Sequence, residues 1–241
     1  MLVAALFACE GSSGVAERSI AGNVDLLTAR TLVVDSVVEV IVTGNPRADD
    51  IAYALDAVVT ASTATVANRL ADRLVIGVDR PEDDVVRVRL DPLDNGTLSG
   101  QLRLTVPSDL DLGVLQRGAQ VTVDSMDAVV QVDSVGAVRI VDPGGYVSVG
   151  VQTGAVIVES TLPVGETTEV AVRNGDIQLL VPQQISAAIM ATAGGAGSVQ
   201  VQHPSLPRPL ANRPYAATVN GGLNSVRLST MNGSVFIQVQ Q

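Results

Sequence analysis

Five consecutive segments between Gly118 and Leu162 decide the fold: GAQVTVDSM (Gly118–Met126), DAVVQVDSV (Asp127–Val135), GAVRIVDPG (Gly136–Gly144), GYVSVGVQT (Gly145–Thr153) and GAVIVESTL (Gly154–Leu162). Each segment opens on Gly or Asp, continues through alternating β-branched residues, and ends in small or polar residues. Gly and Asp tolerate the positive φ of a sharp corner, while Val and Ile suit a pleated, half-buried strand. A unit that recurs every nine residues predicts a stack of short strands. The expected fold is therefore all-β, a single elongated β-solenoid (β-helix) of stacked short rungs.

The composition fits such a stack. The chain has 241 residues, of which 46% are hydrophobic but only 2% are aromatic, and it contains no Trp. A core with so few rings must be filled by Val, Ile, Leu and Ala, each packing on the side chain above it. A continuous repeat of this length favours one elongated domain. Because connections between parallel strands are overwhelmingly right-handed, we expect the solenoid to wind in a right-handed sense.

The charge excludes two classes of partner. The formal net charge is −10, and all 15 cationic residues are Arg. Nucleic acid requires clustered cations that displace counterions from phosphates. A basic patch is likewise required for docking on an anionic membrane. We therefore expect no nucleic-acid partner, and membrane contact only through a lipid anchor.

The amino terminus, MLVAALFACEGSSG, resembles the lipobox of bacterial lipoproteins, in which a signal peptidase cuts before a cysteine that becomes diacylated. Cys9 is the only cysteine, so no intrachain disulfide is possible, and Cys9 is the expected lipidation site. No basic segment precedes the short apolar run, a departure that an upstream start codon would explain. The alternative is an ordinary thiol in a disordered leader. The expected domains are a truncated signal segment (1–9), a flexible tether (10–19) and the β-solenoid (20–241).

One segment breaks the strand pattern near the amino end. Between Ala64 and Leu74, apolar residues recur every four positions and charged residues occupy the other face. This spacing predicts a short helix, with Ser62 or Thr63 as its N-cap. We expect the helix to cover the open end of the stack, because an exposed edge strand would template aggregation.

Two segments that lie far apart in the chain have similar sequences. LRLTVPSDLDLGVLQRGAQV (Leu102–Val121) resembles IQLLVPQQISAAIMATAGGAGSV (Ile177–Val199). In each, a strand closes on Val-Pro, and Pro107 and Pro182 should mark strand ends because proline cannot donate to a ladder. Farther on, QHPSLPRPLANRP (Gln202–Pro214) predicts an extended surface excursion.

The segments AVRNGDIQLLVP (Ala171–Pro182) and VRLSTMNGSVFIQ (Val226–Gln238) resemble a bacterial family of "putative adhesins", β-strand repeat domains of the head-GIN, auto-transporter-adhesin-like type. The resemblance covers roughly Val24 to Gln241. It implies a β-solenoid, usually exported and often lipid-anchored. The family offers no catalytic residues to transfer to this chain. Several corners here lack the family's Asn-Gly-Asp form, as at Met126-Asp127.

Three carboxylates recur at the same point of the repeat: Asp124, Asp133 and Asp142. With two strands per coil, Asp124 and Asp142 would stack about 5 Å apart, and Ca²⁺ could neutralise them. The alternative is a solvated strand end, which we favour because calcium-binding solenoids use a stricter Gly-Gly-x-Gly-x-Asp nonapeptide. No metal or other cofactor is expected.

The remaining candidates for chemistry are weak. His203 is the only histidine, so a zinc site would need carboxylates around it, and a surface-loop role is expected instead. No Gly-x-Ser-x-Gly elbow accompanies it. Glu159, Glu166 and Glu169 cluster in sequence but lack an aromatic platform for a sugar. Other candidates are an acidic loop at Asp79–Asp84 and two outward-facing rings, Tyr146 and Phe236.

Together these patterns predict a non-enzymatic, exported, lipid-anchored cell-envelope protein that presents a rigid β-surface for binding or adhesion. Its partner would be an envelope or extracellular protein or a glycan. Two alternatives stay open: a structural or stress-sensing envelope component that binds another envelope protein, and a carbohydrate-active β-helix enzyme.

Overall fold

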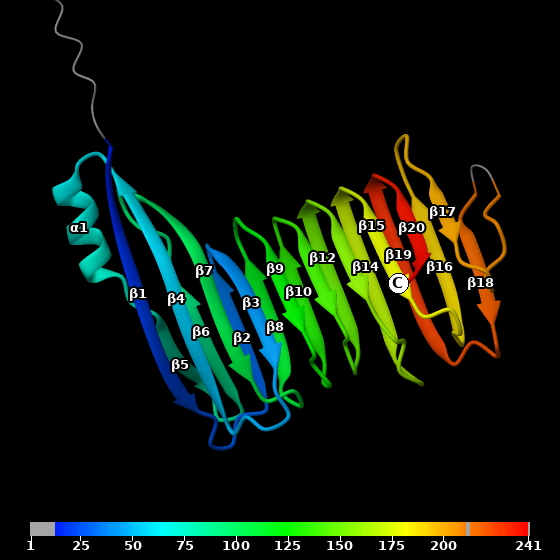
Figure 1. Ribbon diagram of the computed structural model, residues 1–241, viewed down its shortest axis with the longest axis horizontal. Helices are drawn as coiled ribbons and strands as arrows, with labels where there is room; N and C mark the ends of the chain where they lie inside the picture. Colours follow the sequence, from blue (N-terminus) through cyan, green and yellow to red (C-terminus); the bar gives the residue numbers. More distant parts are fainter. Residues whose placement is uncertain (1–12, 211–212, 241) are drawn as a thin grey trace, which may run out of the picture.

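The computed structural model describes residues 13–210 and 213–240, and this part of the chain is nearly all β with one short helix. Its strands form two mixed sheets of ten strands each, which run side by side along an elongated molecule (Figure 1). The helix lies at one end of the molecule and strand β18 lies at the other (Figure 1).

The strands of sheet A, in spatial order, are β1 (Gly14–Asp25), β4 (Asp50–Ala61), β7 (Thr97–Val106), β3 (Glu39–Gly44), β9 (Val121–Asp124), β11 (Val138–Val141), β13 (Val156–Glu159), β15 (Ile177–Val181), β20 (Val235–Val239) and β17 (Val199–Gln202). Those of sheet B are β18 (Tyr215–Val219), β16 (Ala187–Ala193), β19 (Asn224–Asn232), β14 (Thr167–Asn174), β12 (Val147–Thr153), β10 (Val130–Ser134), β8 (Asp111–Gln116), β2 (Thr31–Ser36), β6 (Val85–Leu90) and β5 (Gly77–Glu82).

In the middle of the molecule the chain alternates between the sheets, and each strand lies parallel to the next strand of its own sheet. Val121 pairs with Val138, and Val138 pairs with Val156. The segments after Gly118, Gly136 and Gly154 therefore stack in line, as the repeat predicted. The two steps are 17 and 18 residues long, so the nine-residue spacing slips by one residue within the repeat.

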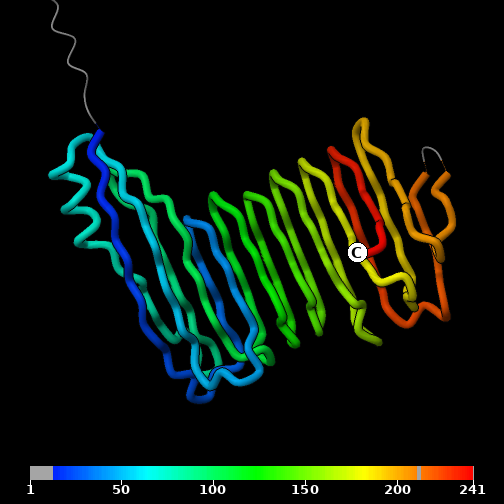
Figure 2. The backbone as a smooth tube through the Cα atoms, viewed as in Figure 1, coloured from blue at the N-terminus to red at the C-terminus, as the bar shows by residue number. Residues whose placement is uncertain are grey.

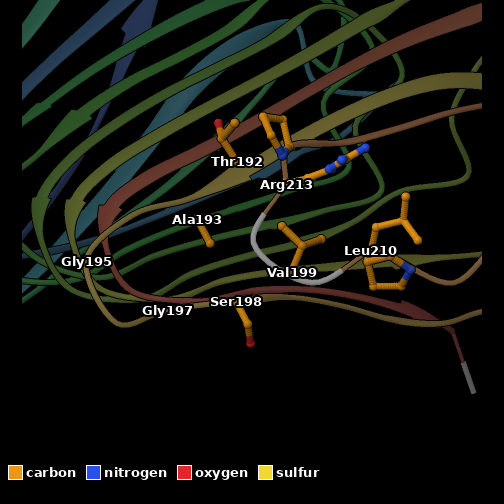
Figure 3. A pocket seen from close by; sticks show the side chains of 10 residues that line it. Thr192, Ala193, Gly195, Gly197, Ser198, Val199, Leu210 and Arg213 are labelled. Atoms are coloured by element: carbon orange, nitrogen blue, oxygen red, sulfur yellow. The ribbon is translucent and has the colours of Figure 1, made fainter.

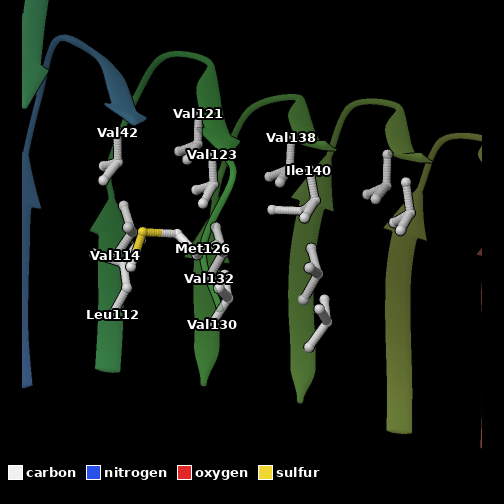
Figure 4. Packing of buried hydrophobic residues seen from close by; sticks show 14 of the residues in the cluster. Val42, Leu112, Val114, Val121, Val123, Met126, Val130, Val132, Val138 and Ile140 are labelled. Atoms are coloured by element: carbon white, nitrogen blue, oxygen red, sulfur yellow. The ribbon is translucent and has the colours of Figure 1, made fainter. Parts of the chain in front are cut away.

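The space between the sheets is filled by aliphatic side chains that stack from strand to strand (Figure 4). Val121, Val123, Val138 and Ile140 are each at most 2% exposed. Met126 lies at a corner and reaches between the strands that carry Val114 and Val132 (Figure 4). Its flexible thioether fills a gap that a branched residue could not. This packing confirms a core built almost without rings.

Glycines stack at the corners that lead from sheet B to sheet A. A Cβ on Gly175 would overlap the carbonyl oxygen of Gly154, and a Cβ on Gly233 would overlap that of Gly175. Gly175 also has a φ of +147°, which side-chain-bearing residues rarely adopt. Its amide donates to Asn232, and the Asn232 side chain donates to Asn174 at 2.9 Å. These Asn-Gly pairs are therefore corners between sheets rather than hairpin turns.

The two ends of the stack depart from the parallel pattern that we expected. β4 is antiparallel to both β1 and β7, β5 is antiparallel to β6, and β18 is antiparallel to β16. At these edges no further level follows, so the chain folds back along the edge, whereas the fourth edge strand, β17, stays parallel to β20. β1 begins at Gly14, within the segment 10–19 that we expected to be a tether.

The predicted helix is α1 (Ala64–Arg73), and the side chain of Thr63 caps it by accepting a hydrogen bond from the Val66 amide at 3.3 Å. Its buried face, Ala67 and Ala71, packs in a small second cluster with residues of β1 and β4. The helix therefore covers the end of sheet A, as expected. On sheet B the end is β5, where Pro81 sits at a break in the register, a position that edge strands allow.

The chain order and the spatial order differ at both ends. We use level for one sheet B strand and the sheet A strand that follows it. The level β2–β3 lies between β6–β7 and β8–β9, and the level β19–β20 lies between β14–β15 and β16–β17. The first and last levels in sequence are thus held inside the stack, one level in from the ends, as the tube in Figure 2 shows.

Candidate functional site

The outer face of sheet B carries a row of small side chains across its middle. Asp133 pairs with both Leu115 and Gly150, Gly150 pairs with Ala171, and Ala171 pairs with Ser229. All of these positions face away from the core, because residues on either side of each are buried. Three adjacent strands therefore present Gly, Ala and Ser in register, and the surface is hollow there.

A second outward row lies two residues farther along the same strands and carries longer side chains: Arg117, Val135, Gln152, Arg173 and Met231. Together the two rows form a groove of about 630 Å³, which we call the sheet B groove. It is lined by Leu115, Gln116, Arg117, Asp133, Ser134, Val135, Gly150, Val151, Gln152, Ala171, Val172, Arg173, Ser229 and Met231.

The groove exposes apolar side chains that the core does not use. Leu115 is 43% exposed, Val135 is 38% exposed and Met231 is 65% exposed. Such side chains gathered at one hollow are more informative than the same residues scattered singly, since clustered exposed apolar groups mark binding surfaces. Because the groove crosses five adjacent strands, β8 to β19, its length is about 19 Å.

Two guanidinium groups line one bank of the groove. Arg117 is held by Asp35 at 2.6 Å. Arg173 is exposed, and none of the ion pairs among residues 13–210 and 213–240 includes it. On the floor, the Asp133 carboxylate leans over Gly150, where an added Cβ would come within 2.8 Å of it. The groove therefore offers one free cation, one carboxylate and apolar walls.

A second hollow of about 430 Å³ lies at the end of the stack, between the β16–β17 corner and the proline-rich excursion (Figure 3). Gly195, Gly197 and Ser198 form one side, and Leu210 and Arg213 approach from the other. It is smaller than the sheet B groove and gathers fewer large apolar side chains.

The stacked carboxylates, the reading of the repeat that we did not favour, do not form. In sheet A, Asp124 pairs with Val141, so Asp142 lies one residue out of register with it. Asp133 is in sheet B. The one-residue slip in the repeat is the cause, and Asp142, with φ of +45°, occupies the corner instead. Within the described part of the chain, no group of three or more His, Cys, Asp or Glu is placed to hold a metal ion.

His203 is buried, 6% exposed, and the expectation of a surface-loop residue was wrong. Its Nδ1 accepts from the Ser205 amide at 3.2 Å, so Nε2 carries the proton and donates to the Pro182 carbonyl at 2.9 Å. The ring thus ties the start of the excursion to the end of β15. Alternation could not reveal this contact, because the excursion has no strand period.

The three clustered glutamates are separated by the fold. Glu159 is in sheet A and forms an ion pair with Arg139, whereas Glu169 is in sheet B and forms one with Arg227 at 3.0 Å. Glu166 lies in the turn before β14. The carbohydrate-active alternative needs two carboxylates on either side of one glycosidic bond, and these residues do not provide that arrangement.

The other predicted residues lie as follows. Tyr146 and Phe236 are half-buried, and the Tyr146 hydroxyl donates to Glu169 at 3.4 Å. The acidic loop is in part the edge strand β5, whose Asp79 is exposed. Cys9 lies outside the described residues. None of these residues lines the sheet B groove.

Sequence reasoning missed the groove, although its signal was present. Gly150 and Ala171 occupy outward strand positions where an exposed sheet usually carries Thr, Arg or Gln. Ser229 comes from a strand more than fifty residues away in sequence. Only the register of β14 with β19 shows that the three are neighbours.

In the part of the chain that the structure describes, no helix has the length and apolar character needed to cross a membrane.

No family model matches the chain, and no match was found among curated proteins. Among solved structures, the chain is similar to a "putative cell adhesion protein" from Clostridium sporogenes, with a TM-score of 0.51 and 12% identity over 93% of this chain and 100% of that chain. It also matches a "putative adhesin" from Bacteroides fragilis, with a TM-score of 0.45 and 14% identity over 92% of this chain and 97% of that chain. The first of these similarities shows a shared fold.

Proposed function

We propose that the chain is an exported, lipid-anchored protein of the bacterial cell envelope, whose β-solenoid presents a fixed surface for binding or adhesion without catalysis. The observation that carries the proposal is the sheet B groove on a rigid face. Its five strands are held in register by parallel ladders, so the face loses little conformational entropy when a partner binds. The shared fold with a protein named for cell adhesion is consistent with this role.

The solenoid assignment rests on the in-register parallel levels and on the corner glycines that lie on one another. Anchoring rests on the sequence MLVAALFAC, in which Cys9 occupies the lipobox cysteine position. Export follows from anchoring, because the lipid is attached outside the cytoplasm. The partner would be an envelope or extracellular protein or a glycan.

Metabolic labelling with a fatty-acid analogue tests the anchor. The wild type and Cys9→Ser are expressed from a start upstream of Met1, and label on the wild type alone is the expected result. A wild type without label would remove the anchor and most of the argument for the location. Binding is tested separately, by measuring retention of labelled envelope fractions on the immobilised full chain. A chain that retains nothing above a serum-albumin control would overturn the binding role.

A further inference from the structure

We infer that the sheet B groove binds an extended peptide segment with aliphatic side chains and an acidic residue, the acidic residue meeting Arg173. This inference rests on the proposed binding function and names its ligand class. The groove lies across the strands, so the peptide would run along the length of the stack rather than join a sheet as an added strand.

The dimensions set the size of the occupant. A groove that crosses five strands is about 19 Å long. An extended peptide rises about 3.3 Å per residue, so about six residues fill it. The floor of Gly150, Ala171 and Ser229 leaves room for side chains to enter, and Leu115, Val135 and Met231 supply the apolar contact.

The charge around Arg173 selects an acidic residue at that place, whereas the Asp133 carboxylate lies on the groove floor two strands away. The chain carries 25 acidic and 15 cationic residues, so most of its surface repels a carboxylate. Arg173 is exposed on the bank of the groove and pairs with no carboxylate among the described residues. A guanidinium that the protein's own carboxylates leave free can bind a ligand carboxylate bidentately.

The polar groups favour a peptide over two other occupants. None of the lining residues is aromatic, and sugars bind by stacking on rings. Along the length of the groove, Gln152, Ser229 and Arg173 offer hydrogen bonds between the apolar side chains. A peptide backbone offers an N–H or C=O group at every residue to pair with these three side chains, whereas the acyl chain of a fatty acid would leave them unpaired.

The probe is a pool of fluorescein-labelled hexapeptides of Val, Leu and Ser with one Glu, compared with the same pool carrying Lys in place of Glu. Binding to the full chain is measured by fluorescence anisotropy. We expect at least tenfold tighter binding of the Glu pool. Arg173→Glu should reverse this preference, and Ala171→Arg, which fills the floor, should weaken both pools at least tenfold.

The matched controls are Arg208→Glu, an exposed arginine of the excursion, and Ala216→Arg, an exposed alanine of β18. Both should bind as the wild type does. Circular dichroism must show that every variant is folded. The inference is overturned if neither pool binds, if the Lys pool binds equally well, or if Arg173→Glu leaves the preference unchanged. Palmitate that displaces the Glu pool in an Arg173-dependent way would also overturn it in favour of a lipid.

Failure of the groove inference and failure of the proposed function give different results in these experiments. If the wild type retains envelope fractions and Arg173→Glu retains them equally, the groove inference fails and the proposed binding function stands. If the wild type retains nothing and Cys9 takes up no label, the proposed function itself fails. Retention that is lost with Arg173→Glu and blocked by the Glu pool supports both.

Discussion

The middle of the molecule and its two ends differ in how their strands pair and in how much of the sheet edge must be covered. From β8 to β15, successive strands alternate between the sheets, every pair is parallel, and corner glycines lie one upon another. At the ends, three of the four edge strands (β1, β5 and β18) pair antiparallel. A helix packs on β1 and β4, and a proline-rich excursion precedes β18. A middle level always has a neighbour on each side. An end level exposes unpaired N–H and C=O groups, which must be covered or kept from other chains.

Near the ends, the spatial order of the levels also departs from their order in the sequence. After β7 the next level steps over β2–β3, and after β15 the next level steps over β19–β20. Both steps begin at the Val-Pro sequences, Val106-Pro107 and Val181-Pro182. The first and last levels fill the spaces left by these two steps. The last level is therefore locked inside the stack, whereas β1, the first strand in sequence, lies at the edge of sheet A.

The largest effect should follow from removing the last level. A chain that ends at Gly222 lacks β19 and β20, the strands that join β14–β15 to β16–β17. We expect β16 to β18 to lose all amide protection in hydrogen exchange, while β10 in the same protein stays protected. If β16 stays protected, the levels β14–β15 and β16–β17 must have paired with each other, and the last level is not needed to hold that end of the stack.

A corner glycine should cost more than a strand glycine. Gly175→Ala places a Cβ against the Gly154 carbonyl at a φ of +147°, so we expect a loss of about 3 kcal/mol in the free energy of unfolding. Gly113→Ala is the control, because its Cβ would meet only the Val33 side chain at 3.8 Å and the Leu32 carbonyl oxygen at 3.9 Å, both at ordinary contact distance. It should be neutral or stabilise by up to about 1 kcal/mol. Urea unfolding measures both; equal losses would show that the corner stack is not tight.

The sequence predicted the middle because each unit there is local. In segments such as DAVVQVDSV (Asp127–Val135), alternation and a corner residue within nine positions specify the strand and its buried face. It predicted less of the ends, where the neighbours of β2 and β16 are fixed by strands far away in sequence. The two similar Val-Pro segments could be recognised in the sequence. However, no local pattern indicates that a level from a distant part of the chain packs between the levels on either side of them. The groove was hidden for the same reason, since β19 completes its floor.

Tyr215 in the end strand β18 carries a hydroxyl with no hydrogen-bond partner among the described residues, although the side chain is only 5% exposed. Tyr215→Phe should therefore raise the free energy of unfolding by about 1 kcal/mol. Burial raises the pKa of Tyr215 above 10.0. Stability should then fall as the pH rises past about 10 in the wild type, because the unfolded chain ionises first, and this fall should be smaller in the variant. Thermal unfolding at pH 7 and above pH 10 measures both; a less stable variant at pH 7 would reveal a partner for the hydroxyl.

Removing the helix cap at the amino end should have a slightly smaller effect on stability. Thr63→Ala removes the side chain that accepts from the Val66 amide, and a loss of about 1 kcal/mol is expected. Ser62→Ala is the matched control and should change little. If α1 protects the edge of sheet A, hydrogen exchange in β1 should also quicken with Thr63→Ala alone. A β1 that exchanges equally in both variants would mean that the strand holds without its helix.

The smallest expected effect concerns a three-strand bridge on the outer face of the amino end. Asp56 in β4 accepts from Ser19 in β1 at 2.9 Å and from Arg103 in β7 at 2.8 Å, and these bonds, Ser19's first, lower the pKa of Asp56 below 3.8. A carboxyl whose folded pKa is depressed contributes stability above the unfolded value, and this contribution is lost as the pH falls through the folded value. Ser19→Ala should raise the pKa of Asp56 toward 3.8 and make acid unfolding below about pH 4 less steep. Carboxyl NMR titration measures the shift, with Arg103→Gln as a second variant that should also raise the pKa. An unchanged titration in Ser19→Ala would mean that Arg103 alone holds the carboxylate, and that β1 adds no charge-assisted bond to the edge it covers.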